Sequence, residues 1–204
     1  MFSSKQNIKD KGVSSGVGRL QYLQQLVTEF QKTTDDIYKR QVIANLANFS
    51  YDPVNYGYLQ QLNVIDLFLD SLSDDNLVEL AVGGLCNIAL DKQCKEYILQ
   101  NDGVQMLKEC LSNQNEEVVL SGITTLIFLI TPASKLEITA PEVIACMQRF
   151  STSLSTRLSN LATVFMQDYC TESQLNSCLT TTKPIGIPLP ASTPPETTNT
   201  SDNS

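Results

Sequence analysis

The apolar positions between residues 41 and 169 follow a helical spacing that repeats about every forty residues. The segment Ala44–Asp52 aligns without gaps to Gly83–Asp91 at a shift of 39, and a third copy that begins at Val118 follows the second at a shift of 41. A further amphipathic helix is expected around Leu158–Tyr169, where apolar residues recur at three- and four-residue intervals. Successive segments of this chain therefore have the same local structure.

This period predicts a stack of short helices. Armadillo and HEAT repeats have units of about 40 residues, and each unit exposes an apolar face that only its neighbour covers. Caps, prolines and first-turn acids at the expected helix starts support this reading, namely Asp52–Pro53, Asn115–Glu117, Thr131–Pro132 and Pro141–Glu142. We predict an all-α fold, an armadillo-type right-handed α-solenoid of about three to four short helical repeats. A helical bundle is the alternative, although a bundle does not require similarity between successive segments.

Composition divides the chain into three zones. Residues 1–18 are rich in Ser, Gly and Lys and are expected to form a disordered arm, whereas residues 19–179 carry the repeats. Residues 180–204 are rich in Thr, Pro and Ser and are expected to be disordered with polyproline II character. A candidate docking motif within this tail consists of Ile185, Ile187, Pro188, Leu189 and Pro190. The motif either binds a partner or caps the last repeat, and a passive linker is the alternative.

The charge of the chain favours protein partners over nucleic acid. The formal net charge is −8 with a pI near 4.5, and 19 acidic residues face 9 basic ones between Leu20 and Leu179. Such a surface repels phosphate, so no direct nucleic-acid contact is expected from the repeat domain. No apolar run approaches the roughly 18 residues of a membrane span, and the first residues lack the apolar core of a signal peptide. We expect an intracellular protein that binds neutral or basic protein segments.

The residue types needed for most catalytic and metal sites are missing or scattered. The chain has no histidine, which removes imidazole metal ligands and histidine-dependent nucleophiles. Its six cysteines form no CxxC pair and lie mostly in apolar helical positions, as expected for core residues or free thiols in a reducing compartment. No GxSxG or phosphate-binding motif is present. We predict no enzymatic activity, no cofactor and no metal.

The third helix of each predicted unit should line a concave groove that binds a partner. Asn48 and Asn87 occupy equivalent positions in two units, and an amide can both donate to and accept from the main chain of an extended peptide. The alternative is that these amides bond to adjacent repeats. Small neighbours that leave space for a ligand backbone, together with the third-unit equivalents, complete the predicted groove: Asn45, Gly83, Gly84, Thr124 and Phe128. Because the asparagine ladder ends at Phe128, a long peptide groove is not expected.

Two further clusters each have two interpretations. One group of acids either meets a basic partner or caps helices, namely Asp74, Asp75, Glu116 and Glu117. Three tyrosines near one turn either anchor an interface or pack between repeats, namely Tyr51, Tyr56 and Tyr58.

The segments Gly18–Phe30 and Gln41–Ser73, the latter QVIANLANFSYDPVNYGYLQQLNVIDLFLDSLS, resemble a small member of the armadillo-repeat family. The similarity extends through Gly83–Asn87 and Ser121–Leu126 to Gly186–Pro190. This resemblance implies a scaffold in the nucleus that pairs with an RNA-recognition-motif protein in the minor spliceosome and supports removal of U12-type introns. It implies no residue-level binding map, so the groove residues above rest on repeat geometry. A cytosolic armadillo peptide-binding adaptor outside splicing is the alternative function.

Overall fold

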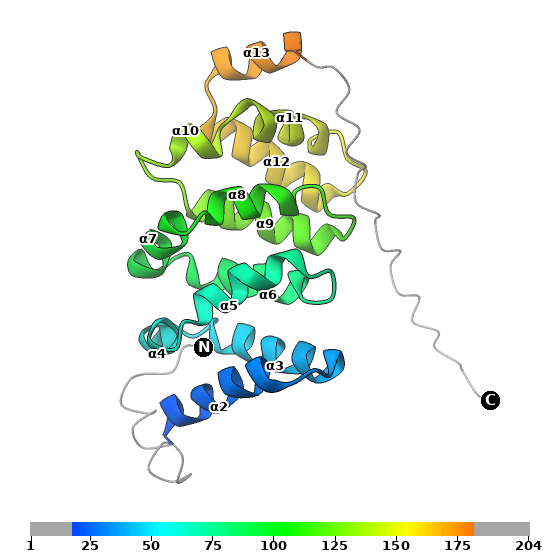
Figure 1. The fold of residues 1–204 in the computed structure, drawn as a ribbon. Helices are drawn as coiled ribbons and strands as arrows, with labels where there is room; N and C mark the ends of the chain where they lie inside the picture. Colours follow the sequence, from blue (N-terminus) through cyan, green and yellow to red (C-terminus); the bar gives the residue numbers. More distant parts are fainter. Residues whose placement is uncertain (1–17, 182–204) are drawn as a thin grey trace, which may run out of the picture.

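The computed structural model describes residues 18–181, and all regular structure in this range is helical (Figure 1). The predicted N-terminal arm and the tail motif Ile185–Pro190 lie outside these residues, while the last helix continues to Thr181. The helices are α2 (Arg19–Lys32), α3 (Asp36–Phe49), η1 (Pro53–Asn55), α4 (Tyr56–Gln61), α5 (Val64–Asp70), η2 (Ser71–Ser73), α6 (Val78–Ile88), α7 (Lys92–Gln100), α8 (Gly103–Cys110), α9 (Glu116–Phe128), α10 (Lys135–Ile138), α11 (Pro141–Phe150), α12 (Thr156–Tyr169) and α13 (Glu172–Thr181).

The helices are arranged as repeated units along one axis (Figure 1). Helices α4–α6, α7–α9 and α10–α12 are three units of three helices each, and within the described residues α2 and α3 precede them. The third helices contact one another in the order α3, α6, α9 and α12, and α5, α8 and α11 each pack against the third helix of their own unit. Helix α13 packs on α11 at the far end. The predicted all-α solenoid is confirmed.

The repeating sequence positions become a continuous core. Leu46, Leu85 and Leu126 occupy the same position in α3, α6 and α9, and all three side chains are fully buried. Helix α6 is covered by α3 on one side and by α9 on the other, so its apolar residues face two neighbouring units. Burying a Leu side chain stabilises the fold by about 1.5–3 kcal/mol. One buried leucine per unit, in register, therefore contributes to a core that runs through consecutive units.

The turn between the first and second helices also repeats. Asn63 precedes α5 with φ 54°, and Asp102 precedes α8 with φ 55°. Asn and Asp adopt this left-handed backbone more readily than other non-glycine residues. The two residues are one repeat apart in the alignment, so the same backbone turn sets the angle between helices in both units.

Three of the four predicted helix starts are found. Asp52 caps η1, Asn115 caps α9, and Pro141 is the first residue of α11. The fourth start, at Thr131, is present as a cap but precedes the regular helix by one turn. Thr131 and Ser134 exchange hydrogen bonds through their main-chain amides and hydroxyls, at 2.8 and 3.1 Å, and the Lys135 amide donates to the Thr131 main-chain oxygen at 3.0 Å. Helix α10 follows from Lys135.

Candidate functional site

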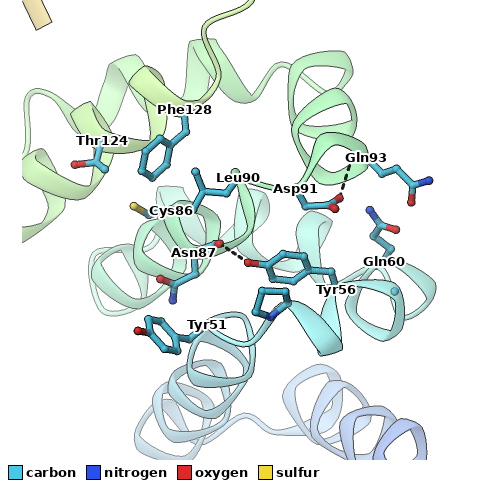
Figure 2. A pocket seen from close by; sticks show the side chains of 12 residues that line it. Tyr51, Tyr56, Gln60, Cys86, Asn87, Leu90, Asp91, Gln93, Thr124 and Phe128 are labelled. Atoms are coloured by element: carbon cyan, nitrogen blue, oxygen red, sulfur yellow. Dashed lines mark hydrogen bonds between the residues drawn. The ribbon is translucent and has the colours of Figure 1, made fainter. Parts of the chain in front are cut away.

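A concave pocket of about 670 Å³ lies where three successive units meet (Figure 2). It is bordered by the turn after α3, by α4 and the C-terminal end of α6, and by the outer face of α9. Its lining side chains are mostly aromatic, aliphatic or amide groups: Tyr51, Pro53, Tyr56, Gly57, Gln60, Cys86, Asn87, Leu90, Asp91, Gln93, Thr124 and Phe128. Such a mixture suits a peptide ligand, because it offers apolar area together with a few hydrogen-bonding groups.

Asn87 ties the floor of this pocket to the preceding unit. Its side-chain Nδ2 donates to the main-chain oxygen of Ala47 in α3 at 3.2 Å. The hydroxyl of Tyr56 in turn donates to the main-chain oxygen of Asn87 at 2.9 Å (Figure 2). Asn87 thus joins α3 to the unit α4–α6, which agrees with the alternative that this asparagine bonds to an adjacent repeat. Its Oδ1 accepts no hydrogen bond from a residue within 18–181 and faces the pocket side of α6.

The electrostatic surroundings of the pocket are weakly acidic. Of the described residues that line it, Asp91 alone carries a charge. Burial raises the pKa of the Tyr56 phenol, and Cys94, Asp91 and Asp52 raise it further. Burial likewise raises the pKa of the Cys86 thiol, so this cysteine stays protonated and unreactive near neutral pH.

Three of the seven predicted groove residues line the pocket. Asn87, Thr124 and Phe128 lie together around it (Figure 2), and the Thr124 hydroxyl donates to the Leu120 main-chain oxygen of its own helix at 2.8 Å. Phe128 is half-buried and packs against the core from the upper side of the pocket. These three residues of α6 and α9 therefore share a pocket, and binding of a partner there stays a prediction.

The other four predicted groove residues lie away from the pocket. Asn48 is exposed, and its side chain makes no hydrogen bond with a residue in the described part of the chain. Asn45 is half-buried and accepts from Gln41 at 3.4 Å within α3. Gly83 has open space around it, because an added Cβ would meet no atom within 4 Å.

The prediction that Gly84 leaves room for a ligand is wrong. Gly84 is buried, and an added Cβ would lie 2.5–2.8 Å from three ring atoms of Phe68. Phe68 belongs to α5 and is fully buried. The missing side chain therefore makes space for an aromatic ring of the core and not for a partner.

Sequence reasoning missed several residues of the pocket, although the repeat contained a signal for them. Tyr51 and Leu90 are equivalent in the alignment, and both are exposed large apolar residues, at 59% and 63%. Tyr51 and Tyr56 line the pocket, and Tyr56 and Tyr58 both pack against the core, so the interface reading is favoured for Tyr51 alone. Exposed apolar residues recurring at one repeat position would have identified the edge of the pocket.

The acidic residues at the start of α9 connect two units. Glu116 accepts from the hydroxyl of Ser155 at 2.7 Å, and Glu117 pairs with Arg157, whose Nη2 lies 3.0 Å from Oε2. The Arg157 hydrogen bond lowers the pKa of Glu117. Asp74 accepts from the main-chain amide of Asn76 at 2.8 Å at the start of its turn. These contacts favour the capping and linking reading for Asp74, Glu116 and Glu117.

Within residues 18–181, no group of His, Cys, Asp and Glu side chains is arranged to hold a metal ion. The same residues contain no helix with both the length and the apolar character needed to cross a membrane. The described cysteines are free thiols, and Cys94 and Cys110 are buried.

Comparisons with known proteins agree with the fold. Two engineered proteins solved by the Northeast Structural Genomics Consortium superpose with TM-scores of 0.59 and 0.64, at 17% and 15% sequence identity, over 69% and 76% of this chain. The aligned region is 59% of the first of these proteins and 69% of the second. At such low identity the likeness concerns the fold alone.

A protein from mouse (Mus musculus), Armadillo repeat-containing protein 7, is 52% identical over 186 residues, which is 88% of this chain and 94% of the mouse protein. No general family model matches the sequence. Since the identity extends over nearly the whole of both chains and the structure is a helical repeat stack, this protein belongs to the family of Armadillo repeat-containing protein 7.

Proposed function

We propose that this protein is a non-enzymatic scaffold of the minor spliceosome in the nucleus, where it holds an RNA-recognition-motif protein and supports removal of U12-type introns. Membership of an armadillo-repeat family supports protein binding, and the splicing role rests on the resemblance of residues 18–73 and of the later segments to that family. No catalytic step is part of the proposal.

The observation that carries the binding function is the concave pocket around Asn87. The pocket combines exposed apolar side chains with hydrogen-bonding amides. The packing of α3, α6 and α9 against one another fixes the positions of these side chains. A preformed site loses little entropy when a partner binds. The excess of acidic residues in the repeat region repels the phosphates of RNA. This supports a complex in which the partner contacts RNA and this chain binds the partner.

Depletion followed by rescue tests the splicing role. Cells depleted of this protein should retain U12-type introns while U2-type introns are removed normally, and full-length chain should restore splicing. Affinity purification of the full chain should recover an RNA-recognition-motif protein in a nuclear fraction. Normal removal of U12-type introns after complete depletion would refute the splicing role.

A cytosolic peptide-binding adaptor is the second candidate, because the same pocket can serve any pathway that presents an extended segment. This candidate predicts transport or degradation proteins among the co-purifying partners and no change in intron retention. The two sets of results differ in both measurements, so one experiment separates the candidates.

The tail motif Ile185–Pro190 remains a proposal, since it lies outside the described residues. An apolar, proline-containing segment is preordered for docking. Deleting Lys183–Ser204 should lower the melting temperature if the tail caps the last unit, and should remove partner binding at unchanged melting if the tail docks a partner. No change in either property would leave the tail as a linker.

A further inference from the structure

Arg149 in α11 has a buried guanidinium group without a hydrogen-bond partner. Its Nε and Nη2 atoms are buried, and neither donates to a residue in the part of the chain that the structure describes. The guanidinium carbon lies 5.3 Å from the centre of the Phe150 ring, which attracts the charge but offers no oxygen acceptor. Buried charged groups are normally paired and hydrogen-bonded, because they have lost their contact with water. Arg149 therefore needs an acceptor from outside residues 18–181.

The repeat indicates that this arginine lies at the end of the stack. Ser71, Cys110 and Arg149 are equivalent residues near the ends of three successive second helices, at shifts of 39. Ser71 and Cys110 are both buried, and the turn η2, which contains Ser71, contacts α8 of the next unit. Within the described residues the unit of Arg149 is the last with three helices, and α13 packs on its second helix (Figure 1). The position that meets a following unit at Ser71 is therefore occupied, in the last unit, by an arginine that no following unit in this range covers.

The carboxylate of α11 is already paired. Glu142, the acidic residue of this helix, accepts from Lys108 of α8 at 3.1 Å. Of the salt bridges formed within residues 18–181, none includes Arg149. The missing acceptor therefore comes from one of the two ends of the chain, from solvent or from another molecule.

Charge distinguishes the two ends of the chain. Residues 1–17 carry three lysines against one aspartate, and they precede α2 at the opposite end of the stack. Residues 182–204 carry Glu196 and Asp202 against Lys183, and they follow α13, which packs on α11. The C-terminal tail, residues 182–204, is therefore the end whose charge is complementary to Arg149.

The tail is also close enough and long enough to supply the acceptor. Gln148, the residue before Arg149, donates to the main-chain oxygen of Leu175 in α13 at 3.0 Å, so α13 lies against this end of α11. Glu196 follows the last residue of α13 by 15 positions, and an extended chain of that length spans up to about 50 Å. A tethered group also has an effective concentration in the millimolar range, which favours the chain's own tail over a carboxylate from another molecule.

We propose that Arg149 binds a side-chain carboxylate of the tail, Glu196 or Asp202, and that this ion pair fastens the tail to the last unit. A guanidinium and a carboxylate can form two parallel hydrogen bonds, which satisfy the buried Nε and Nη2 atoms together. The tail then acts as a cap of the stack and not as a free docking arm. This contact goes beyond the proposed splicing role, and neither depends on the other.

Thermal unfolding of the full chain tests the pair by a double-variant cycle. Glu196→Ala with Asp202→Ala removes the acceptors and leaves a buried guanidinium unpaired, which should lower the melting temperature by about 3 °C or more. In a chain that also carries Arg149→Met, the same two tail substitutions should change the melting temperature by less than about 1 °C, because no guanidinium is left to pair. An equal loss with and without Arg149→Met, or no loss in either chain, would overturn the proposal.

Two matched controls accompany the cycle. Thr197→Ala with Thr200→Ala changes the same segment without removing a carboxylate, and should leave the melting temperature unchanged. Arg157→Met removes another arginine of the last unit, one that pairs with Glu117. The two carboxylate substitutions should lower the melting temperature as much in Arg157→Met as in the parent chain. A loss caused by the threonine substitutions, or no loss in Arg157→Met, refutes a pair specific to Arg149.

NMR of the arginine side chains in the nitrogen-labelled full chain locates the contact. The Nε–H signal of Arg149, identified by its absence from Arg149→Met, should exchange slowly with solvent, because the group is buried and hydrogen-bonded. The signal should shift when Glu196 and Asp202 are replaced by Ala, and the single substitution that reproduces the shift identifies the carboxylate. An unchanged signal would mean that solvent or another molecule supplies the acceptor, and the tail would be ruled out as the occupant.

Discussion

Two adjacent glycines of α6 give a sharp test of how the units pack. Gly84 touches the ring of Phe68, where an added Cβ would lie 2.5 Å from Cζ, whereas Gly83 has no atom within 4 Å of an added Cβ. Both residues lie in the interior of the same helix. Replacing either one by Ala therefore brings the same gain in helix propensity, about 1 kcal/mol. Only the substitution at Gly84 adds a steric clash.

The difference between the two variants isolates the packing effect. Phe68 is fully buried, so its ring cannot swing into solvent, and overfilling a packed core destabilises by about 1–3 kcal/mol. We expect Gly83→Ala to raise the free energy of unfolding by up to about 1 kcal/mol. The free energy of unfolding of Gly84→Ala should be lower than that of Gly83→Ala by about 1–3 kcal/mol, because only Gly84→Ala overfills the core. For a chain of this size, the difference corresponds to several degrees in melting temperature.

Urea unfolding of the full chain, followed by circular dichroism, measures this difference. Phe68→Leu alone and combined with Gly84→Ala completes a double-variant cycle, because the smaller leucine makes room for the added methyl group. The coupling between the two substitutions should exceed about 1 kcal/mol and favour the double variant. If Gly83→Ala and Gly84→Ala unfold within about 0.5 kcal/mol of each other, the close packing of α6 on α5 is refuted.

Three further outcomes follow from individual contacts. Asn87→Ala should lower the free energy of unfolding by about 1 kcal/mol, because it removes the hydrogen bond to the Ala47 main-chain oxygen. Asn48→Ala, at an exposed position, should change the free energy of unfolding by less than about 0.5 kcal/mol. Urea unfolding of each variant measures both effects. Burial raises the pKa of the Cys94 thiol to about 12 and that of the Cys110 thiol to about 11. Iodoacetamide at pH 8 should therefore label neither thiol until the chain is unfolded, and peptide mass mapping can check this. Arg157 lowers the pKa of Glu117 below its ordinary 4.5, so the pair stabilises the fold above that pH and loses its effect as the pH falls through the folded pKa. Arg157→Gln should therefore lower the free energy of unfolding by less than about 1 kcal/mol at pH 7. In unfolding measurements at a series of lower pH values, the difference from the parent protein should shrink as the pH falls below 4.5.

The fold could be predicted from the sequence because the repeat appears at several levels. The shift that aligns Leu46 with Leu85 also places Asn63 on Asp102, so core and turn recur together. The hydrophobic periodicity and the cap at Asn115 are both local features, so they can be recognised in the sequence without information on contacts between distant residues. The cap at Thr131 is also local, although the regular helix after it begins only at Lys135.

The pocket was predicted only in part, because its chemistry depends on contacts between units. Thr124 and Phe128 were found by carrying a position from one repeat to the next. Gly84 was misread because a small residue makes space equally for a ligand or for a ring, and Phe68 lies in another helix. Leu90 was missed because an exposed apolar residue after a helix belongs to no amphipathic pattern.

The equivalent residues Asn48, Asn87 and Phe128 have different contacts, because each lies in a different unit of the stack. Asn87 bonds to the Ala47 oxygen because α3 lies beneath α6, whereas among residues 18–181 no third helix lies beneath α3. Within that part of the chain the amide of Asn48 has no equivalent carbonyl partner, and Asn48 is exposed. Phe128, one unit further on, replaces the amide with a ring that forms the upper wall of the pocket. The same repeat position is therefore exposed at Asn48, joins two units at Asn87 and forms a pocket wall at Phe128, and the pocket lies where Asn87 and Phe128 are neighbours.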